Sequence, residues 1–174
     1  MISEYALGKH HRLITSFFVL WGLSTFALCI LLWPNVTGVW ATLGVVLLVI
    51  SGVGEIMGGM FDIKHKFHGL SFMIGVPTLP IAALLIGYYL IAKVDNNNFL
   101  LLASHGPLVG LILMAVAMMV MMSGFKNAGI PMGPDVAPPE RVPEGVIALA
   151  GYANRLLVIS YITWLLVVAN YFKN

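Results

Sequence analysis

The chain has 174 residues, of which 60% are hydrophobic and 9% are charged, and its mean hydropathy is +0.96. A soluble domain carries roughly 25% charged residues, and a chain of this length cannot enclose so much apolar surface in water. The composition therefore excludes an ordinary soluble domain. The net charge of +2, without a run of lysine or arginine, argues against nucleic acid as a partner.

Five apolar stretches are long enough to cross a bilayer, because a spanning helix needs about 20 mostly apolar residues. They cover residues 13–33, 39–60, 70–92, 99–123 and 146–172. Short polar turns separate the first four stretches. Residues 125–145 hold five of the nine prolines and form the one long loop. The pattern predicts an all-α, polytopic transmembrane bundle of about five spans, built as a single membrane domain over residues 1–174.

The basic residues between these stretches are distributed unequally over the two sides of the predicted bundle. The side with the N-terminus carries six of them and the opposite side two: Lys9, Arg12, Lys64, Lys66, Lys126 and Arg141 against Lys93 and Lys173. Cytoplasmic loops are enriched in lysine and arginine. We therefore expect a cytoplasmic N-terminus in a cell membrane of the bacterial inner-membrane type.

The second stretch contains many small residues, including Gly54 and Gly58 in a GxxxG spacing. This spacing lets the backbones of two helices approach closely. It predicts close packing of this helix against another helix of the same chain, or alternatively a contact with a second copy or a partner subunit.

Three ionisable residues lie inside the predicted spans, where such groups are costly and often functional. At a rise of about 1.5 Å per residue, Glu55 lies roughly 8 Å and Arg155 roughly 14 Å from the N-terminal side, and His105 roughly 9 Å from the opposite side. They could form a polar column that serves a substrate or a proton, with Asn154 adding a hydrogen bond. Alternatively, Glu55 and Arg155 neutralise each other and only fix the register of their helices.

A second polar cluster lies between the second and third stretches. On a continued helix, Asp62, His65 and His68 would share roughly one face. A carboxylate and two imidazoles are plausible ligands of a catalytic zinc ion. Alternatively, the neighbouring Lys64 and Lys66 make this a basic loop that faces lipid headgroups, with solvated histidines.

Several short motifs occur in an order that resembles a known family. They are Ser3-Glu4-Tyr5-Ala6-Leu7-Gly8, Phe18-Val19-Leu20-Trp21-Gly22-Leu23, Gly59-Met60-Phe61-Asp62, His68-Gly69 and Asn154-Arg155. Their order and spacing resemble the domain-of-unknown-function family 998, whose members are multi-spanning, mainly prokaryotic membrane proteins. The resemblance implies a bundle of the six-helix type, whose first helix would precede the Ser-Glu-Tyr segment. Members also carry a proline before the acidic residue that corresponds to Asp62, and this chain lacks it.

Three functions are open on these residues. The first is a non-catalytic bundle that binds a lipid, a small molecule or a partner subunit, with the bilayer and possibly a second copy as its partners and no cofactor. The second is a zinc-dependent membrane hydrolase using Asp62, His65 and His68. The third is a small transporter or proton relay through Glu55, Arg155 and His105, against which the absence of a broken-helix repeat in the sequence argues.

Overall fold

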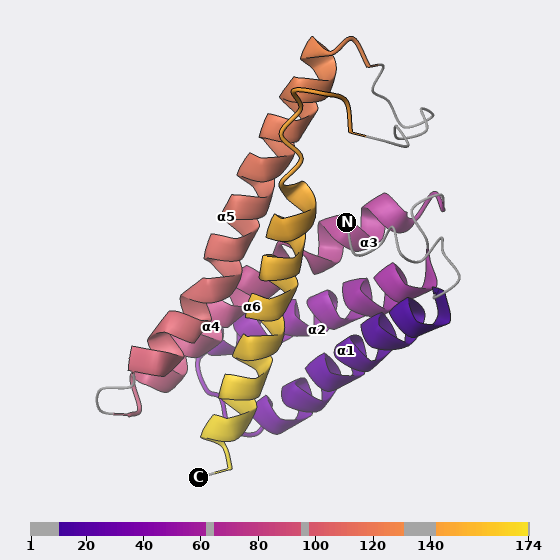
Figure 1. Ribbon diagram of the computed structural model, residues 1–174. Helices are drawn as coiled ribbons and strands as arrows, with labels where there is room; N and C mark the ends of the chain where they lie inside the picture. The colour runs from indigo at the N-terminus through magenta and orange to yellow at the C-terminus, as the bar shows by residue number, and fades with distance from the viewer. Residues whose placement is uncertain (1–10, 62–64, 95–97, 131–141, 174) are drawn as a thin grey trace.

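The computed structural model describes residues 11–61, 65–94, 98–130 and 142–173, and within these residues every regular element is a helix (Figure 1). The helices are α1 (His11–Leu32), α2 (Val39–Met60), α3 (His68–Gly75), α4 (Thr78–Ile91), α5 (Asn98–Asn127) and α6 (Ala150–Tyr171). Five stretches are long and apolar enough to cross a membrane, with α3 and α4 together forming one of them. The predicted all-α membrane bundle is confirmed.

The third stretch differs from the single helix predicted over residues 70–92, because it is divided into α3 and α4 at Val76 and Pro77. Proline has no backbone N–H, so Pro77 and Pro80 each remove one hydrogen bond from the helical ladder. The division therefore follows from two prolines placed three residues apart. Val76, at this junction, lines the candidate site described below.

The last two helices also differ in their bounds from the prediction. α5 continues to Asn127, so helix replaces the first residues of the predicted 125–145 loop. Its 30 residues span about 45 Å, which exceeds the ~30 Å hydrocarbon core of a bilayer. α6 begins at Ala150 instead of 146, after a turn in which Gly145 adopts a positive φ of 83°. The predicted span began too early because residues 146–149, which precede the helix, are all apolar.

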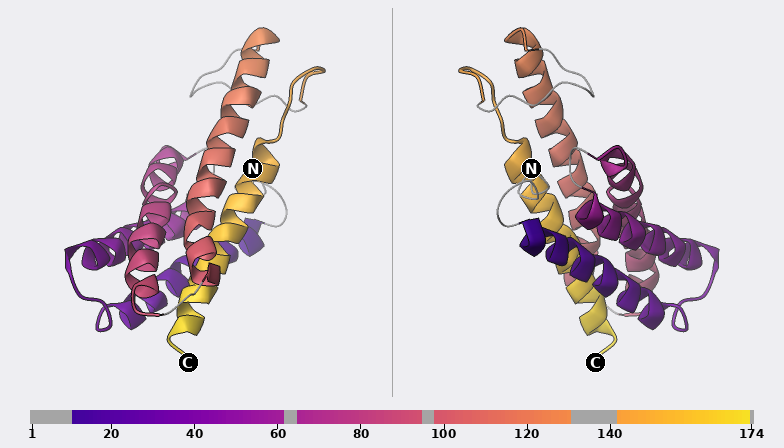
Figure 2. Two further views of the ribbon diagram at one scale, coloured as in Figure 1. Left: turned by 90° about the vertical axis from the view of Figure 1, so that its left-hand side faces the viewer. Right: turned by 90° about the vertical axis from the view of Figure 1, so that its right-hand side faces the viewer.

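The helices pack as two antiparallel pairs, α1 with α2 and α5 with α6, and α4 lies between the pairs. Figures 1 and 2 show that the pairs come together near the C-terminus and diverge toward the other end, where α3 lies between them. α1 and α6 contact each other only sparsely. This divergence leaves room for a cavity lined by α1, α2, α3 and α6.

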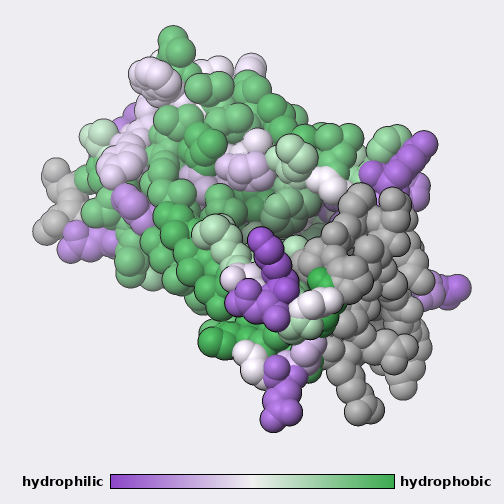
Figure 3. Space-filling view, turned by 90° about the horizontal axis from the view of Figure 1, so that it is seen from above, coloured by the Kyte–Doolittle hydropathy of each residue, from purple (hydrophilic) through white to green (hydrophobic). Residues whose placement is uncertain are grey.

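The core lies where the pairs meet and is centred on Leu48, Leu79, Ile86 and Trp164, all fully buried. The outer surface is also apolar (Figure 3), with exposed side chains such as Ile30, 76% exposed. Apolar side chains on both the inner and outer faces are what a helix between protein and lipid requires. Helix association then depends on close packing more than on a hydrophobic force.

Two helix backbones come very close where α2 meets α3. A Cβ atom on Gly54 would lie 2.4 Å from the Cα atom of Gly75, so neither helix could approach as it does if Gly54 carried a side chain. The predicted close approach of Gly54 therefore occurs within the chain. Gly58, the second glycine of the motif, has only the ring of Phe18 near its Cβ position, at 3.8 Å.

Candidate functional site

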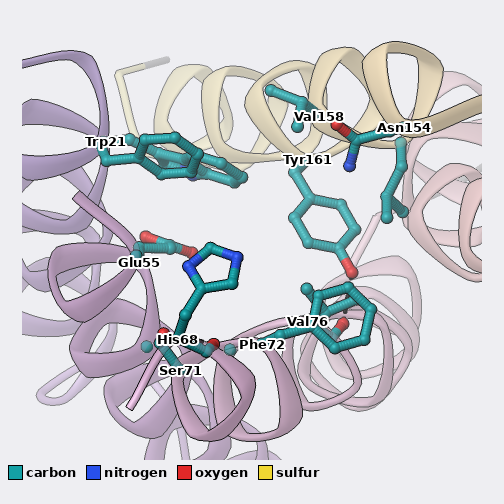
Figure 4. Close-up of a pocket in the computed structure, with 14 residues that line it drawn as sticks. Trp21, Glu55, His68, Ser71, Phe72, Val76, Asn154, Val158 and Tyr161 are labelled. Atoms are coloured by element: carbon teal, nitrogen blue, oxygen red, sulfur yellow. Dashed lines mark hydrogen bonds between the residues drawn. The ribbon is translucent and has the colours of Figure 1, made fainter. Parts of the chain in front are cut away.

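A cavity of about 100 Å³ lies between the two helix pairs (Figure 4). Its lining comes from five parts of the chain: Phe18 and Trp21 of α1; Gly54, Glu55 and Gly58 of α2; His68, Ser71, Phe72 and Gly75 of α3; Val76; and Asn154, Leu157, Val158 and Tyr161 of α6. A cavity of this size holds several waters or a small organic group. Most of the wall is aliphatic or aromatic, and a few polar groups face one another across it.

Glu55 supplies a buried carboxyl group to this wall, because its side chain is only 5% exposed. Its Oε2 lies 2.6 Å from Thr25 Oγ1 of α1, and its Oε1 lies 3.0 Å from Ser51 Oγ, one turn earlier on α2. Thr25 and Ser51 are themselves fully buried. The carboxyl is thus held by two hydroxyl groups in a place where an ionised group without a counter-charge would be very costly.

His68 begins α3 and its ring points into the cavity near Glu55 (Figure 4). Its Nδ1 lies 2.9 Å from the backbone oxygen of Phe61. Because a carbonyl oxygen can only accept, Nδ1 must carry the hydrogen, and Nε2 of the neutral ring is then an acceptor. The end of α2 therefore fixes both the orientation and the tautomer of this histidine.

Trp21 supplies an unused donor to the same wall. The side chain is 8% exposed, and its Nε1–H has no hydrogen-bond partner within the described residues. A buried donor without a partner costs about 1–3 kcal/mol. The cavity itself offers acceptors from Glu55 and His68, and the buried N–H of Trp21 lies on one of its lining residues.

Tyr161 forms the opposite wall and depends on the kink between α3 and α4. Pro80 has no N–H for the oxygen of Val76, its partner four residues earlier in a helix. The hydroxyl of Tyr161 donates to that oxygen instead. The ring of Tyr161 also meets the ring of Trp21 edge to face, with centroids 5.9 Å apart. The aromatic wall is therefore fixed from both sides.

The structure separates the ionisable residues that the sequence grouped into a column. Glu55 and Asn154 line the same cavity, and Nδ2 of Asn154 lies 3.6 Å from the sulfur of Met114. The guanidinium of Arg155 lies over the ring of Tyr152, 5.6 Å from the ring centroid. The side chain of Tyr152 is itself 72% exposed. Within the described residues, the hydrogen bonds to Glu55 come from hydroxyl groups and not from Arg155.

His105 lies outside the cavity, on the face shared by α4 and α5. Its Nδ1 lies 2.8 Å from the backbone oxygen of Leu101, and its Nε2 lies 3.1 Å from the hydroxyl of Tyr88. Since Nδ1 must donate to the carbonyl, the hydroxyl of Tyr88 donates to Nε2. Both ring nitrogens of His105 are therefore used locally.

The loop histidines occupy different environments. His65 is exposed and stacks on the ring of Phe61 at 4.4 Å, whereas His68 faces the cavity. Asp62, the third residue of the predicted zinc site, lies outside the described residues. In the part of the chain that the structure describes, no three histidine, cysteine or acidic side chains converge as metal ligands would.

Sequence reasoning missed four residues of this site: Trp21, Thr25, Ser51 and Tyr161. Ser51 had a usable signal, because it precedes Glu55 by four residues and so shares its helix face. The other three come from α1 and α6, and nothing in an apolar stretch distinguishes a tryptophan in a cavity wall from one in contact with lipid. Only the packing of α1 and α6 brings them together.

Comparison with known proteins supports the resemblance predicted from the short motifs. The model of the family described as "Protein of unknown function (DUF998)" matches residues 1–171. No curated protein and no solved structure matches the chain.

Proposed function

The chain belongs to the DUF998 family, whose function is unknown, and we propose that this multi-pass membrane protein binds a small amphipathic molecule in the cavity between α1, α2, α3 and α6. The observation that carries the proposal is the composition of the cavity wall. Phe18, Phe72 and Val158 give it apolar surface, and a few polar groups converge on it. Ligand sites are mostly apolar concavities with a small number of well-placed polar groups.

Two polar groups in this wall support binding over simple packing. Glu55 is a buried ionisable group, and the Nε1–H of Trp21 is a buried donor without a partner in the described residues. A wall built only for packing would be more stable with apolar side chains of similar volume. A ligand with an apolar body and a hydrogen-bonding head would pair with Glu55 and fill the apolar part of the cavity.

The experiment uses three probes with the same alkyl chain and different heads: decylamine, decanol and decanoate. Saturable binding is measured to the protein in lipid nanodiscs, after subtraction of partitioning into nanodiscs without protein. The key variant is Gly58→Leu, because the Cβ position of Gly58 meets only the Phe18 ring at ordinary contact distance and a longer side chain would fill the cavity. Gly69→Leu, with no atom within 4 Å of its Cβ position, is the matched control.

The proposal expects at least one probe to bind saturably to the wild type and to Gly69→Leu, and more weakly to Gly58→Leu. If none of the three binds saturably to the wild type, or if Gly58→Leu binds as the wild type does, the proposal is wrong. Both variants are first compared with the wild type in thermal stability, so that a loss of binding is separated from a loss of folding.

We further propose that the protein lies in the cell membrane with its N-terminus in the cytoplasm. The side of the predicted bundle that holds the N-terminus carries the excess of lysine and arginine, and this supports the orientation. The cavity would then lie in the cytoplasmic half of the bundle, since Glu55 is five residues before Met60, the end of α2 on that side.

A further inference from the structure

We propose that the ligand of this cavity is a lipophilic amine, whose ammonium group takes the place of a proton on Glu55. This inference rests on the proposed binding function and specifies the chemical class of the ligand. Three features carry it: the hydrogen bonds around Glu55, the charges in the cavity wall and the aromatic side chains.

The hydrogen bonds around Glu55 fit a carboxyl that gains and loses a proton. The hydroxyl of Ser51 lies 3.0 Å from both Glu55 Oε1 and the backbone oxygen of Gly75, and the hydroxyl of Thr25 lies within reach of Glu55 Oε2 and the backbone oxygen of Trp21. Two hydroxyl hydrogens thus face four acceptors. With a proton on Glu55, the carboxyl donates to one hydroxyl, which passes its own hydrogen to a backbone oxygen.

Without that proton, both hydroxyls rotate to donate to the carboxylate. The oxygen of Trp21 keeps its helical surroundings inside α1. The hydroxyl of Thr78 lies 3.3 Å from the oxygen of Gly75 but closer, at 2.6 Å, to the oxygen of Ile74. The same side chains can therefore hold either form of Glu55. What the ionised form lacks is a positive charge, because a buried carboxylate requires a partner.

In the part of the chain that the structure describes, the cavity wall carries no permanent positive charge beside Glu55. Among the described residues, no lysine or arginine lines the cavity. The titratable groups that face Glu55 from neighbouring helices are Cys29 of α1, His68 of α3 and Tyr161 of α6. In the neutral ring of His68, Nε2 is an acceptor, and an N–H of an ammonium group would then find both a carboxylate and an imidazole nitrogen.

Aromatic rings surround the same space. Phe18, Trp21, Phe72 and Tyr161 all line the cavity. The faces of aromatic rings attract cations, and sites for organic ammonium groups are commonly built from them. An anion would meet the repulsion of Glu55, and a neutral head would leave the ionised form without a counter-charge. The exchange is balanced: the protonated carboxyl and the ammonium give an ammonium carboxylate pair and one proton, which goes to the solvent.

The probe series separates this inference from the proposed function. We expect decylamine to bind the wild type about tenfold or more tightly than decanol and decanoate, and Glu55→Gln to remove that preference. Glu144→Gln is the control, because Glu144 is exposed on the loop before α6 and the change in charge is the same. In weakly buffered solution at neutral pH, binding of decylamine should release protons, up to one per bound molecule, in the wild type and none in Glu55→Gln.

Equal binding of all three probes, or decylamine binding without proton release, would overturn the inference while leaving the proposed function in place. Absence of saturable binding by any probe would overturn the proposed function itself. If Glu55→Gln does not fold, the preference among probes and the proton release in the wild type still decide the question. Proton release by a folded Glu55→Gln variant would assign the proton to another group and contradict the exchange.

Discussion

The hydroxyl of Tyr161 donates a hydrogen bond to the backbone oxygen of Val76, the oxygen that Pro80 leaves without its helical donor. This bond joins α6 to the junction of α3 and α4 across one side of the cavity. Pro80 therefore contributes both to the kink and to the position of the aromatic wall. In an apolar surrounding, a backbone oxygen left without a donor is costly, so this bond should matter for stability.

Replacement of Tyr161 by phenylalanine tests that bond. We expect Tyr161→Phe to lower the free energy of unfolding by about 1–2 kcal/mol, because the oxygen of Val76 loses its donor while the ring remains. The measurement is unfolding in mixed micelles with increasing SDS. Tyr152→Phe, at an exposed position on the same helix, should change the value little.

A double-mutant cycle with Pro80 tests whether Tyr161 stabilises the bundle through its bond to the oxygen of Val76. Pro80→Ala restores a backbone N–H four residues after Val76, so Tyr161→Phe should cost less in that background than in the wild type. An equal cost in both backgrounds would show that Tyr161 stabilises the bundle by packing and not through the oxygen that Pro80 leaves without a helical donor.

The contact of Gly54 with Gly75 gives a second prediction. In Gly54→Ala the added methyl group would lie 2.4 Å from the backbone of Gly75, so α2 and α3 must separate. We expect a loss of about 1–3 kcal/mol in the free energy of unfolding. Gly69→Ala, which introduces the same methyl group into open space on α3, should be neutral or slightly stabilising. Equal stability of the two variants would contradict the close packing.

The fold was largely accessible from the sequence, and the site was accessible only in part. The spans follow from apolar length, and α2 was predicted with its observed bounds because polar turns flank it. Glu55 and Asn154 stood out as polar residues at depth, and both line the cavity. The direction of a long side chain was not accessible: from the sequence Arg155 could reach Glu55 or His105, and in the structure its guanidinium lies over Tyr152. Which helices meet, and hence the role of Trp21, depends on tertiary packing.

The separate environment of His105 gives a third prediction. His105 is bonded to Tyr88 and to the backbone of its own helix, away from the cavity. We therefore expect His105→Gln to leave probe binding unchanged within about twofold, as for independent sites. The same nanodisc assay measures it. A loss as large as that of Gly58→Leu would instead support a polar path that includes His105 and Glu55.

The proposed orientation can be measured by cysteine labelling in a background in which Cys29, itself buried, is replaced by alanine. Lys93→Cys and Lys66→Cys place exposed thiols at opposite ends of the bundle. A maleimide that does not cross membranes should label Lys93→Cys in intact cells, and Lys66→Cys only after permeabilisation. The reverse pattern would put the N-terminus outside the cytoplasm.

The central claim, that a small amphipathic molecule occupies the cavity, is tested most directly by photolabelling with a diazirine-bearing decylamine, followed by mapping of the labelled peptides. We predict labelling concentrated around Trp21 and Val158, which line the cavity, that excess decylamine suppresses and Gly58→Leu weakens. Labelling spread over lipid-facing residues such as Val109 and Leu166, and equal in the wild type and the variant, would contradict the claim.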